Sequence, residues 1–82
     1  VRALHEIRAL LVGYYRAPEP RLGVGDEVSV GTLVGSIVSL GLANEVRADR
    51  EGIVVETPVT DGQPVEYGQL LVLIRPKEEA AE

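Results

Sequence analysis

The chain has 82 residues, of which 45% are hydrophobic, and its eight basic and thirteen acidic side chains give a net charge of −5. A chain of this length forms one small domain and buries about 60% of the surface that its unfolded form exposes. The absence of cysteine excludes disulfides and thiolate metal sites, no apolar run is long enough to cross a bilayer, and the acidic balance argues against a nucleic-acid binder.

Glycine and proline punctuate the chain from Gly13 to Pro76, at intervals too short for a helix of about twelve residues in its middle. Between them lie short runs rich in β-branched residues, which predict strands. We expect strands at residues 5–9, 11–16, 28–30, 33–40, 42–48, 52–59, 65–67 and 70–75. Residues 1–11 also show apolar residues at helical spacing, but we predict a strand there because this run leads into the strand at 11–16.

The second half of the chain repeats the first. After a shift of 37 residues, the pattern Gly-x-x-Val-x-x-Gly-x-x-(Val/Leu)-x-x-Ile that starts at Gly25 starts again at Gly62. With a slightly different shift, residues 12–15 resemble residues 51–54, each a glycine followed by a strand-like run. A lone pair of short strands is marginally stable in water, so the two halves must pack on each other.

Four ordered segments carry a resemblance to a known family: LVGYYRAP, VGDEVSVG, NEVRADREGIVVE and VTDGQPVEYGQLLVLI. In this order and spacing they are similar to biotin carboxyl carrier proteins, of the biotinyl/lipoyl domain family, over about residues 7–74. The resemblance implies an all-β flattened barrel, a barrel-sandwich hybrid of two four-stranded halves related by a pseudo-twofold axis. The domain would span residues 1–76, followed by an acidic tail at 77–82.

One departure from the family changes the chemistry. Counted from Gly31 without a gap, the Glu-Ala-Met-Lys-Met acceptor motif falls on residues 38–42, Val-Ser-Leu-Gly-Leu. Gly41 therefore replaces the lysine that carries biotin, and Leu40 and Leu42 replace the methionines. Acylation needs a nucleophilic amine, and the only lysine, Lys77, lies in the tail. We expect neither biotin nor lipoate, and a tight hairpin turn with positive φ at Gly41.

Other positions are expected to shape the surface. The stretch 20–24 is shorter than in carriers with a protruding thumb, so we expect no thumb. We name Leu40, Leu42, Ala43 and Asn44 as candidate partner contacts. Two exposed leucines are unusual in a turn, and they either dock on a partner or fold back over the barrel end. In the strand at 42–48 we expect Glu45 and Arg47 to face solvent and Val46 and Ala48 to face inward.

The resemblance also implies a function. Plants contain carrier-like subunits of acetyl-CoA carboxylase that lack the acceptor lysine, replace active carriers and lower activity. We therefore expect a non-catalytic or regulatory subunit in fatty-acid synthesis, recognised by biotin carboxylase or by carrier subunits, in the cytoplasm. The alternative is a structural module of another multi-subunit assembly. We assign no catalytic or metal site, because His5 is the only histidine and has no evident partner.

Overall fold

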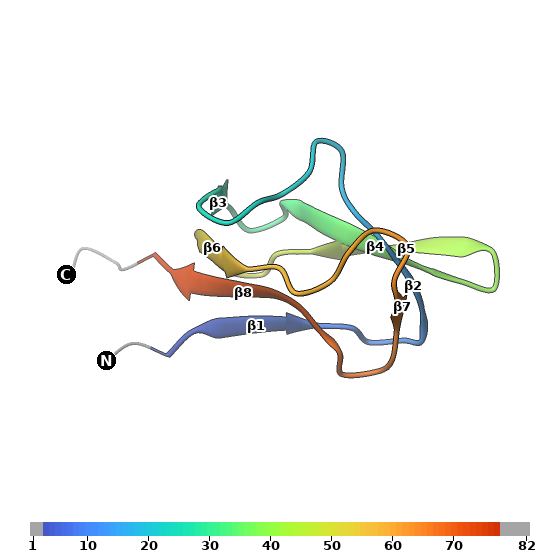
Figure 1. Ribbon diagram of the computed structural model, residues 1–82. Helices are drawn as coiled ribbons and strands as arrows, with labels where there is room; N and C mark the ends of the chain where they lie inside the picture. The colour runs from blue at the N-terminus through green and yellow to red at the C-terminus, as the bar shows by residue number, and fades with distance from the viewer. Residues whose placement is uncertain (1–2, 78–82) are drawn as a thin grey trace.

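The computed structural model describes residues 3–77 as two four-stranded antiparallel sheets (Figure 1). The strands are β1 (His5–Arg8), β2 (Gly13–Arg16), β3 (Glu27–Val28), β4 (Leu33–Ser39), β5 (Leu42–Arg47), β6 (Gly52–Glu56), β7 (Pro64–Val65) and β8 (Leu70–Pro76). One sheet has the strand order β1-β8-β6-β3 and the other β5-β4-β2-β7; we call them sheet A and sheet B. Residues 3–77 contain no helix, and so none that could span a membrane.

The predicted fold class is confirmed, and all eight predicted strands are present. The differences lie at strand ends: the structure ends β6 at Glu56 and not at residue 59, and it begins β2 at Gly13 and not at residue 11. The residues from 57 to 60 carry no strand pairing, because Pro58 has no N–H to donate to a ladder. The connection from Ala17 to Asp26 contains no strand.

An aliphatic core lies between the two sheets. Its largest fully buried side chains are Ile37, Leu71, Ile74, Val28, Val34, Val54, Val65 and Val72. Along β6 and in most of β4 and β8 they alternate with less buried residues, as a half-buried strand requires, while Leu71 and Val72 are consecutive and both buried. Since burying one Val, Leu or Ile contributes about 1.5–3 kcal/mol, this set supplies the main driving force for folding.

The two halves repeat in their contacts as well as in sequence. The amide of Gly31 donates to the carbonyl of Ala48 and the amide of Gly68 donates to that of Ala9, both at 2.8 Å. The strand residues Ala9 and Ala48 differ by 39 positions and the turn residues by 37, as in the sequence repeat. The backbone hydrogen bonds therefore follow the same pseudo-twofold relation as the sequence.

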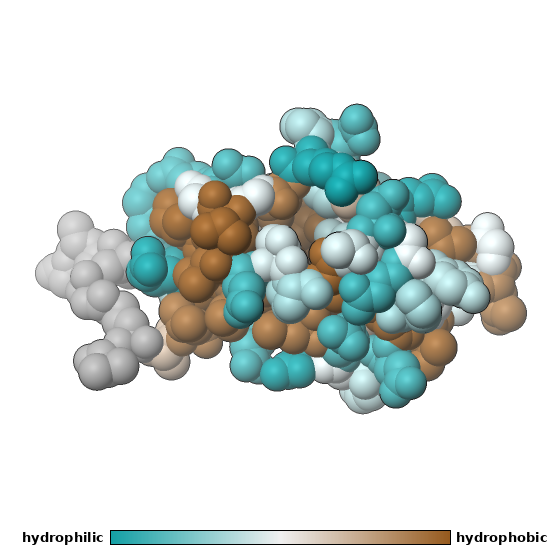
Figure 2. Space-filling model, in the orientation of Figure 1, coloured by the Kyte–Doolittle hydropathy of each residue, from teal (hydrophilic) through white to brown (hydrophobic). Residues whose placement is uncertain are grey.

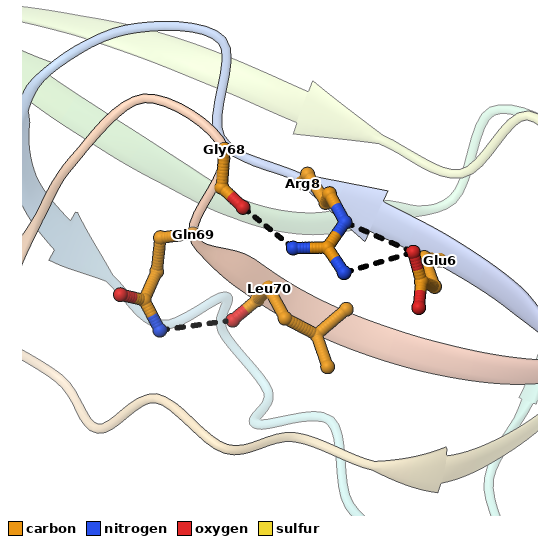
Figure 3. A network of polar contacts seen from close by, with 5 residues as sticks. All are labelled: Glu6, Arg8, Gly68, Gln69 and Leu70. Carbon is orange, nitrogen blue, oxygen red and sulfur yellow. Dashed lines mark hydrogen bonds and ion pairs between the residues drawn. The ribbon is translucent and has the colours of Figure 1, made fainter.

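Two arginines hold the connections between the sheets. Arg8 of β1 donates from Nη1 to the carbonyl of Gly68 at 2.6 Å and from Nε to Glu6 at 2.9 Å (Figure 3). Arg47 of β5 makes the equivalent bonds, to the carbonyl of Gly31 at 2.8 Å and to Glu45 at 2.7 Å. Each arginine thereby ties an edge strand to the turn where the chain crosses between sheets. The carboxylate beside it neutralises the guanidinium.

Two glycines allow strands to approach closely at equivalent places. A Cβ on Gly13 would collide with the carbonyl oxygen of Val38, and a Cβ on Gly52 would collide with that of Arg75. Both obstacles are backbone atoms in the next strand, which cannot move without breaking the ladder. Side chains at these two positions are therefore excluded by the packing of the sheets.

We expect Gly13→Ala to lower the free energy of unfolding by about 1–3 kcal/mol, the usual cost of overpacking. Gly23→Ala is the matched control, because its nearest neighbour, an Asp26 carboxylate oxygen, is 3.9 Å from an added Cβ. The measurement is urea unfolding of both variants. Equal midpoints for the two would contradict the close approach.

Tyr15 is the one buried aromatic side chain among residues 3–77. Its hydroxyl donates to the carbonyl of Val34 at 2.7 Å inside the core. Burial raises the pKa of this phenol above its ordinary value, and the Asp61 carboxylate adds to the rise while Arg21 opposes it. The neutral hydroxyl is therefore the form that the folded state stabilises.

We expect Tyr15→Phe to cost about 1–3 kcal/mol at neutral pH, because the Val34 carbonyl then loses its donor. The raised pKa also predicts a pH dependence. The contribution of Tyr15 is fully present below the unfolded pKa, near 10, and is lost as the pH rises through the higher folded value. Thermal unfolding from pH 8 to 12 should show an alkaline decline that is smaller in the variant; equal slopes would contradict it.

Candidate functional site

The hairpin that joins β4 to β5 forms one end of the molecule, opposite the two chain ends (Figure 1). Ser39 and Leu42 are paired, and between them lie only Leu40, with φ 53°, and Gly41, with φ 78°. Positive φ at both central residues defines a type I′ turn, whose twist matches that of the strands. The predicted reversal and the predicted positive φ at Gly41 are both confirmed.

The space around Gly41 is open, since no atom lies within 4 Å of a Cβ built there. Glycine is thus favoured at this position only by the backbone conformation. A larger residue would fit sterically at a cost of about 1–2 kcal/mol for left-handed φ. Leu40 already bears such a cost, because it is the only non-glycine residue with positive φ among residues 3–77.

The hairpin end is apolar and exposed. Leu40 is 100% exposed and Leu42 is 69% exposed, so neither folds back over the end of the barrel. The space-filling view shows hydrophobic surface at this end of the molecule (Figure 2). From Val38 to Asn44 there is no charged side chain. The structure therefore presents an uncharged, leucine-bearing loop to solvent.

The remaining candidate contacts differ in how firmly they are held. Ala43 and Asn44 are both exposed. The Asn44 amide nitrogen donates to the carbonyls of Ile37 at 3.2 Å and Leu42 at 3.1 Å. These bonds fix the Asn44 side chain and stiffen the base of the hairpin. The inward and outward orientations predicted along the rest of β5 are confirmed, with Ala48 buried and Glu45 and Arg47 exposed.

A groove of about 460 Å³ runs between the edge strands β1 and β5. Ile7, Leu11 and Val46 contribute apolar lining, and the Glu6–Arg8 and Glu45–Arg47 pairs lie along it. These pairs are related by the pseudo-twofold relation, so the groove lies where the two halves meet. The sequence analysis did not identify it, although the repeated Glu-(Ile/Val)-Arg pattern was a usable signal.

His5 has a partner that the sequence did not indicate. Its Nε2 lies 2.7 Å from Oδ1 of Asp49. This hydrogen bond lowers the pKa of the Asp49 carboxyl below its ordinary value, against an opposing effect of burial. Among residues 3–77, no Ser, Thr or Lys side chain hydrogen-bonds to this pair, and these residues hold no cluster of three metal-ligating side chains.

The one lysine lies far along the chain from the hairpin. Lys77 follows β8, and its amide donates to the carbonyl of Glu51 at 2.8 Å, while its Nζ is 3.8 Å from a Glu51 carboxylate oxygen. β8 ends at the same end of the molecule as the chain termini (Figure 1). The rest of the predicted acidic tail, residues 78–82, lies outside the described residues.

Comparisons with known proteins agree with this architecture. The family model described as "Biotin-requiring enzyme", of the biotin/lipoyl family, matches residues 13–74. The biotin carboxyl carrier protein of acetyl-CoA carboxylase from Nostoc sp. is 42% identical over 78 residues, which are 89% of this chain and 43% of that protein. The corresponding protein of Haemophilus influenzae is 32% identical over 85% of this chain and 48% of its own length. The chain thus spans less than half the length of these relatives.

Solved structures share the fold. The urea carboxylase of Kluyveromyces lactis superposes with a TM-score of 0.79 at 25% identity, over 92% of this chain and 6% of that one. A succinylglutamate desuccinylase/aspartoacylase from Rhodobacter sphaeroides gives a TM-score of 0.70 at 20% identity, over 93% and 23%. Taken with its two repeated half-barrels and its β4–β5 hairpin, this chain belongs to the biotin/lipoyl domain family, and it is similar to biotin carboxyl carrier proteins of acetyl-CoA carboxylase.

Proposed function

We propose that this domain carries neither biotin nor lipoate and acts as a non-catalytic or regulatory subunit of acetyl-CoA carboxylase in fatty-acid synthesis, in the cytoplasm. One observation carries the proposal. At the apex of the β4–β5 hairpin, where the acceptor motif has its lysine, the chain has Gly41, while the two sheets and the core beneath are complete.

The missing amine decides the chemistry. In biotinylation the amine nitrogen attacks the acyl carbon of biotinyl-adenylate, an amide bond forms and the adenylate leaves. Gly41 offers only a backbone amide, which is not a nucleophile. Lys77 has an amine, but its Nζ lies beside Glu51, and the residue follows β8, which ends on the side of the molecule opposite the hairpin (Figure 1). A ligase that recognises a hairpin apex finds no acceptor there.

The intact fold suggests how such a subunit acts. A domain with the shape of a carrier can take a carrier's place beside biotin carboxylase or among carrier subunits. It then delivers no carboxyl group, because it has no arm on which to hold one. The complex would lose activity in proportion to the number of carriers replaced, and the subunit would act by occupancy alone.

One observation favours a second function. The same fold occurs in the desuccinylase/aspartoacylase structure, and the name of that protein indicates no carboxylase. On that alternative, the domain is a structural biotinyl/lipoyl-like module of another multi-subunit assembly. It would bind neither biotin carboxylase nor a carrier subunit. The binding experiment below separates the two.

We expect no biotin on this chain after incubation with a biotin ligase, ATP and biotin. Intact-mass spectrometry should return the unmodified mass, with the Nostoc carrier protein as the positive control. The matched variant is the triple substitution Leu40→Met, Gly41→Lys, Leu42→Met, which restores the acceptor motif at the apex. It lowers the free energy of unfolding by about 1–2 kcal/mol, because the new lysine must adopt a positive φ. A biotin adduct on the unaltered chain would refute the proposal.

Added to an acetyl-CoA carboxylase assembled from the Nostoc carrier, its biotin carboxylase and its carboxyltransferase, the domain should lower the rate of acetyl-CoA carboxylation. The expected loss is linear in the fraction of carrier replaced, since each replaced carrier removes one arm. Co-precipitation with biotin carboxylase and with the carrier, each alone, identifies the binding partner. An unchanged rate together with no binding to either protein would favour the structural module.

A further inference from the structure

The outward face of sheet B carries an apolar row that crosses all four strands. The register pairs Tyr14 of β2 with Pro64 of β7 on one side and with Val38 of β4 on the other, and Val38 with Ala43 of β5. Tyr14 is 60% exposed, and Pro64 and Ala43 are also exposed. The face of a sheet that does not cover a core normally carries polar residues, so this row has no explanation within the domain.

The pseudo-twofold relation provides an internal comparison. The equivalent row on sheet A is formed by Glu27, Ile53 and Arg75, which the register also places side by side. The fourth place in that row, equivalent to Ala43, is held by the exposed Leu4, so two of its four positions are charged and two are apolar. A row without charges is therefore specific to sheet B and does not follow from the fold. Val38, the equivalent of Arg75, also stands where the acceptor motif has a glutamate.

A second row lies two residues along the strands and is polar. It consists of Arg16, Ser36 and Glu45, again paired across β2, β4 and β5. Within residues 3–77 the Arg16 guanidinium makes no hydrogen bond or ion pair, and Arg47 contacts only one of the two Glu45 oxygens. The face thus has a cation on one side of β4 and an anion on the other.

This arrangement is complementary to itself. We propose that two copies of the domain associate through their sheet B faces, about a twofold axis that runs parallel to β4. That rotation places Arg16 opposite Glu45 of the second copy, and the bulky Tyr14 opposite the small Ala43 of the second copy. Val38 meets its own counterpart near the axis. Such isologous contacts occur in most twofold dimers, and two sheets commonly pack with nearly aligned strands.

Two orientations of a twofold axis in the plane of the sheet are possible, parallel or perpendicular to the strands, and the charges favour the parallel one. A twofold axis perpendicular to the strands, between the two rows, would place Arg16 over Tyr14 and Glu45 over Ala43 of the second copy. It would bury two charged groups against uncharged side chains, which is unfavourable. Only the parallel axis brings Arg16 opposite a carboxylate, since Glu45 has one oxygen that Arg47 does not contact.

The size and charge of the face limit the strength of the dimer. Four strands about 4.8 Å apart form a face smaller than the roughly 800 Å² per partner of a standard interface. The net charge of −5 on each copy adds repulsion, which salt screens. We therefore expect association at high micromolar to millimolar protein and not at nanomolar concentration.

The test is sedimentation equilibrium of the whole chain over a concentration series at about 150 mM salt. At this ionic strength, charges are screened over about 8 Å. The wild-type chain should show a monomer–dimer equilibrium. Val38→Glu, which puts two carboxylates together at the axis, should weaken the dimer by about tenfold or more. Arg75→Gln at the equivalent place on sheet A changes the net charge by the same amount and should leave the dimer unchanged.

A charge exchange tests the geometry. Arg16→Glu and Glu45→Arg should each weaken the dimer, and the double variant should restore it, because opposite charges then face each other again. Circular dichroism establishes that each variant is folded, and Tyr14→Ser replaces Val38→Glu if that variant is not. A wild-type chain that stays monomeric at millimolar concentration would overturn the proposal. So would a dimer that Val38→Glu and Tyr14→Ser leave intact, or a double variant no better than the single ones.

Discussion

The structure depends on the mutual burial of two small sheets that cannot exist apart. Each sheet has two edge strands and one apolar face, and the side chains of Ile37 and Ile74, one from each half, are both fully buried between them. Within each sheet, one pair of strands pairs closely only because Gly13 or Gly52 leaves room for a carbonyl of the next strand. In a chain with no Trp, Phe, Cys or Met, packing of small aliphatic residues must supply the stability.

This constraint explains the separation between the fold and the hairpin apex. Residues such as Tyr15 and Ile37 lie in the interior, and their replacement would affect every strand. Leu40 and Gly41 contact no core residue, since they extend beyond the last paired residues of β4 and β5. The residues at the apex can therefore change without loss of the fold beneath them.

The sequence predicted the fold well, because its signals are local. Glycine and proline delimit every strand, and the 37-residue repeat indicates the pairing of the halves. Contacts between distant residues were out of reach. The bond from His5 to Asp49 joins residues 44 positions apart, and no local pattern links the two positions. The left-handed conformation of Leu40 was also missed, because leucine is not among the residues that usually favour it.

The pseudo-twofold relation has a consequence for the order in which the chain is connected. β1 and β8 pair antiparallel, with His5 opposite Ile74, just as β4 and β5 do at the other end. By the pseudo-twofold relation, the start of β1 and the end of β8 are therefore equivalent to the two strand ends that the hairpin loop joins between β4 and β5. A circular permutant can be opened between Leu40 and Gly41 and closed by a short linker from Lys77 to Ala3. It would keep every strand pairing, with a loop joining β8 to β1 and the new chain ends at the β4–β5 hairpin.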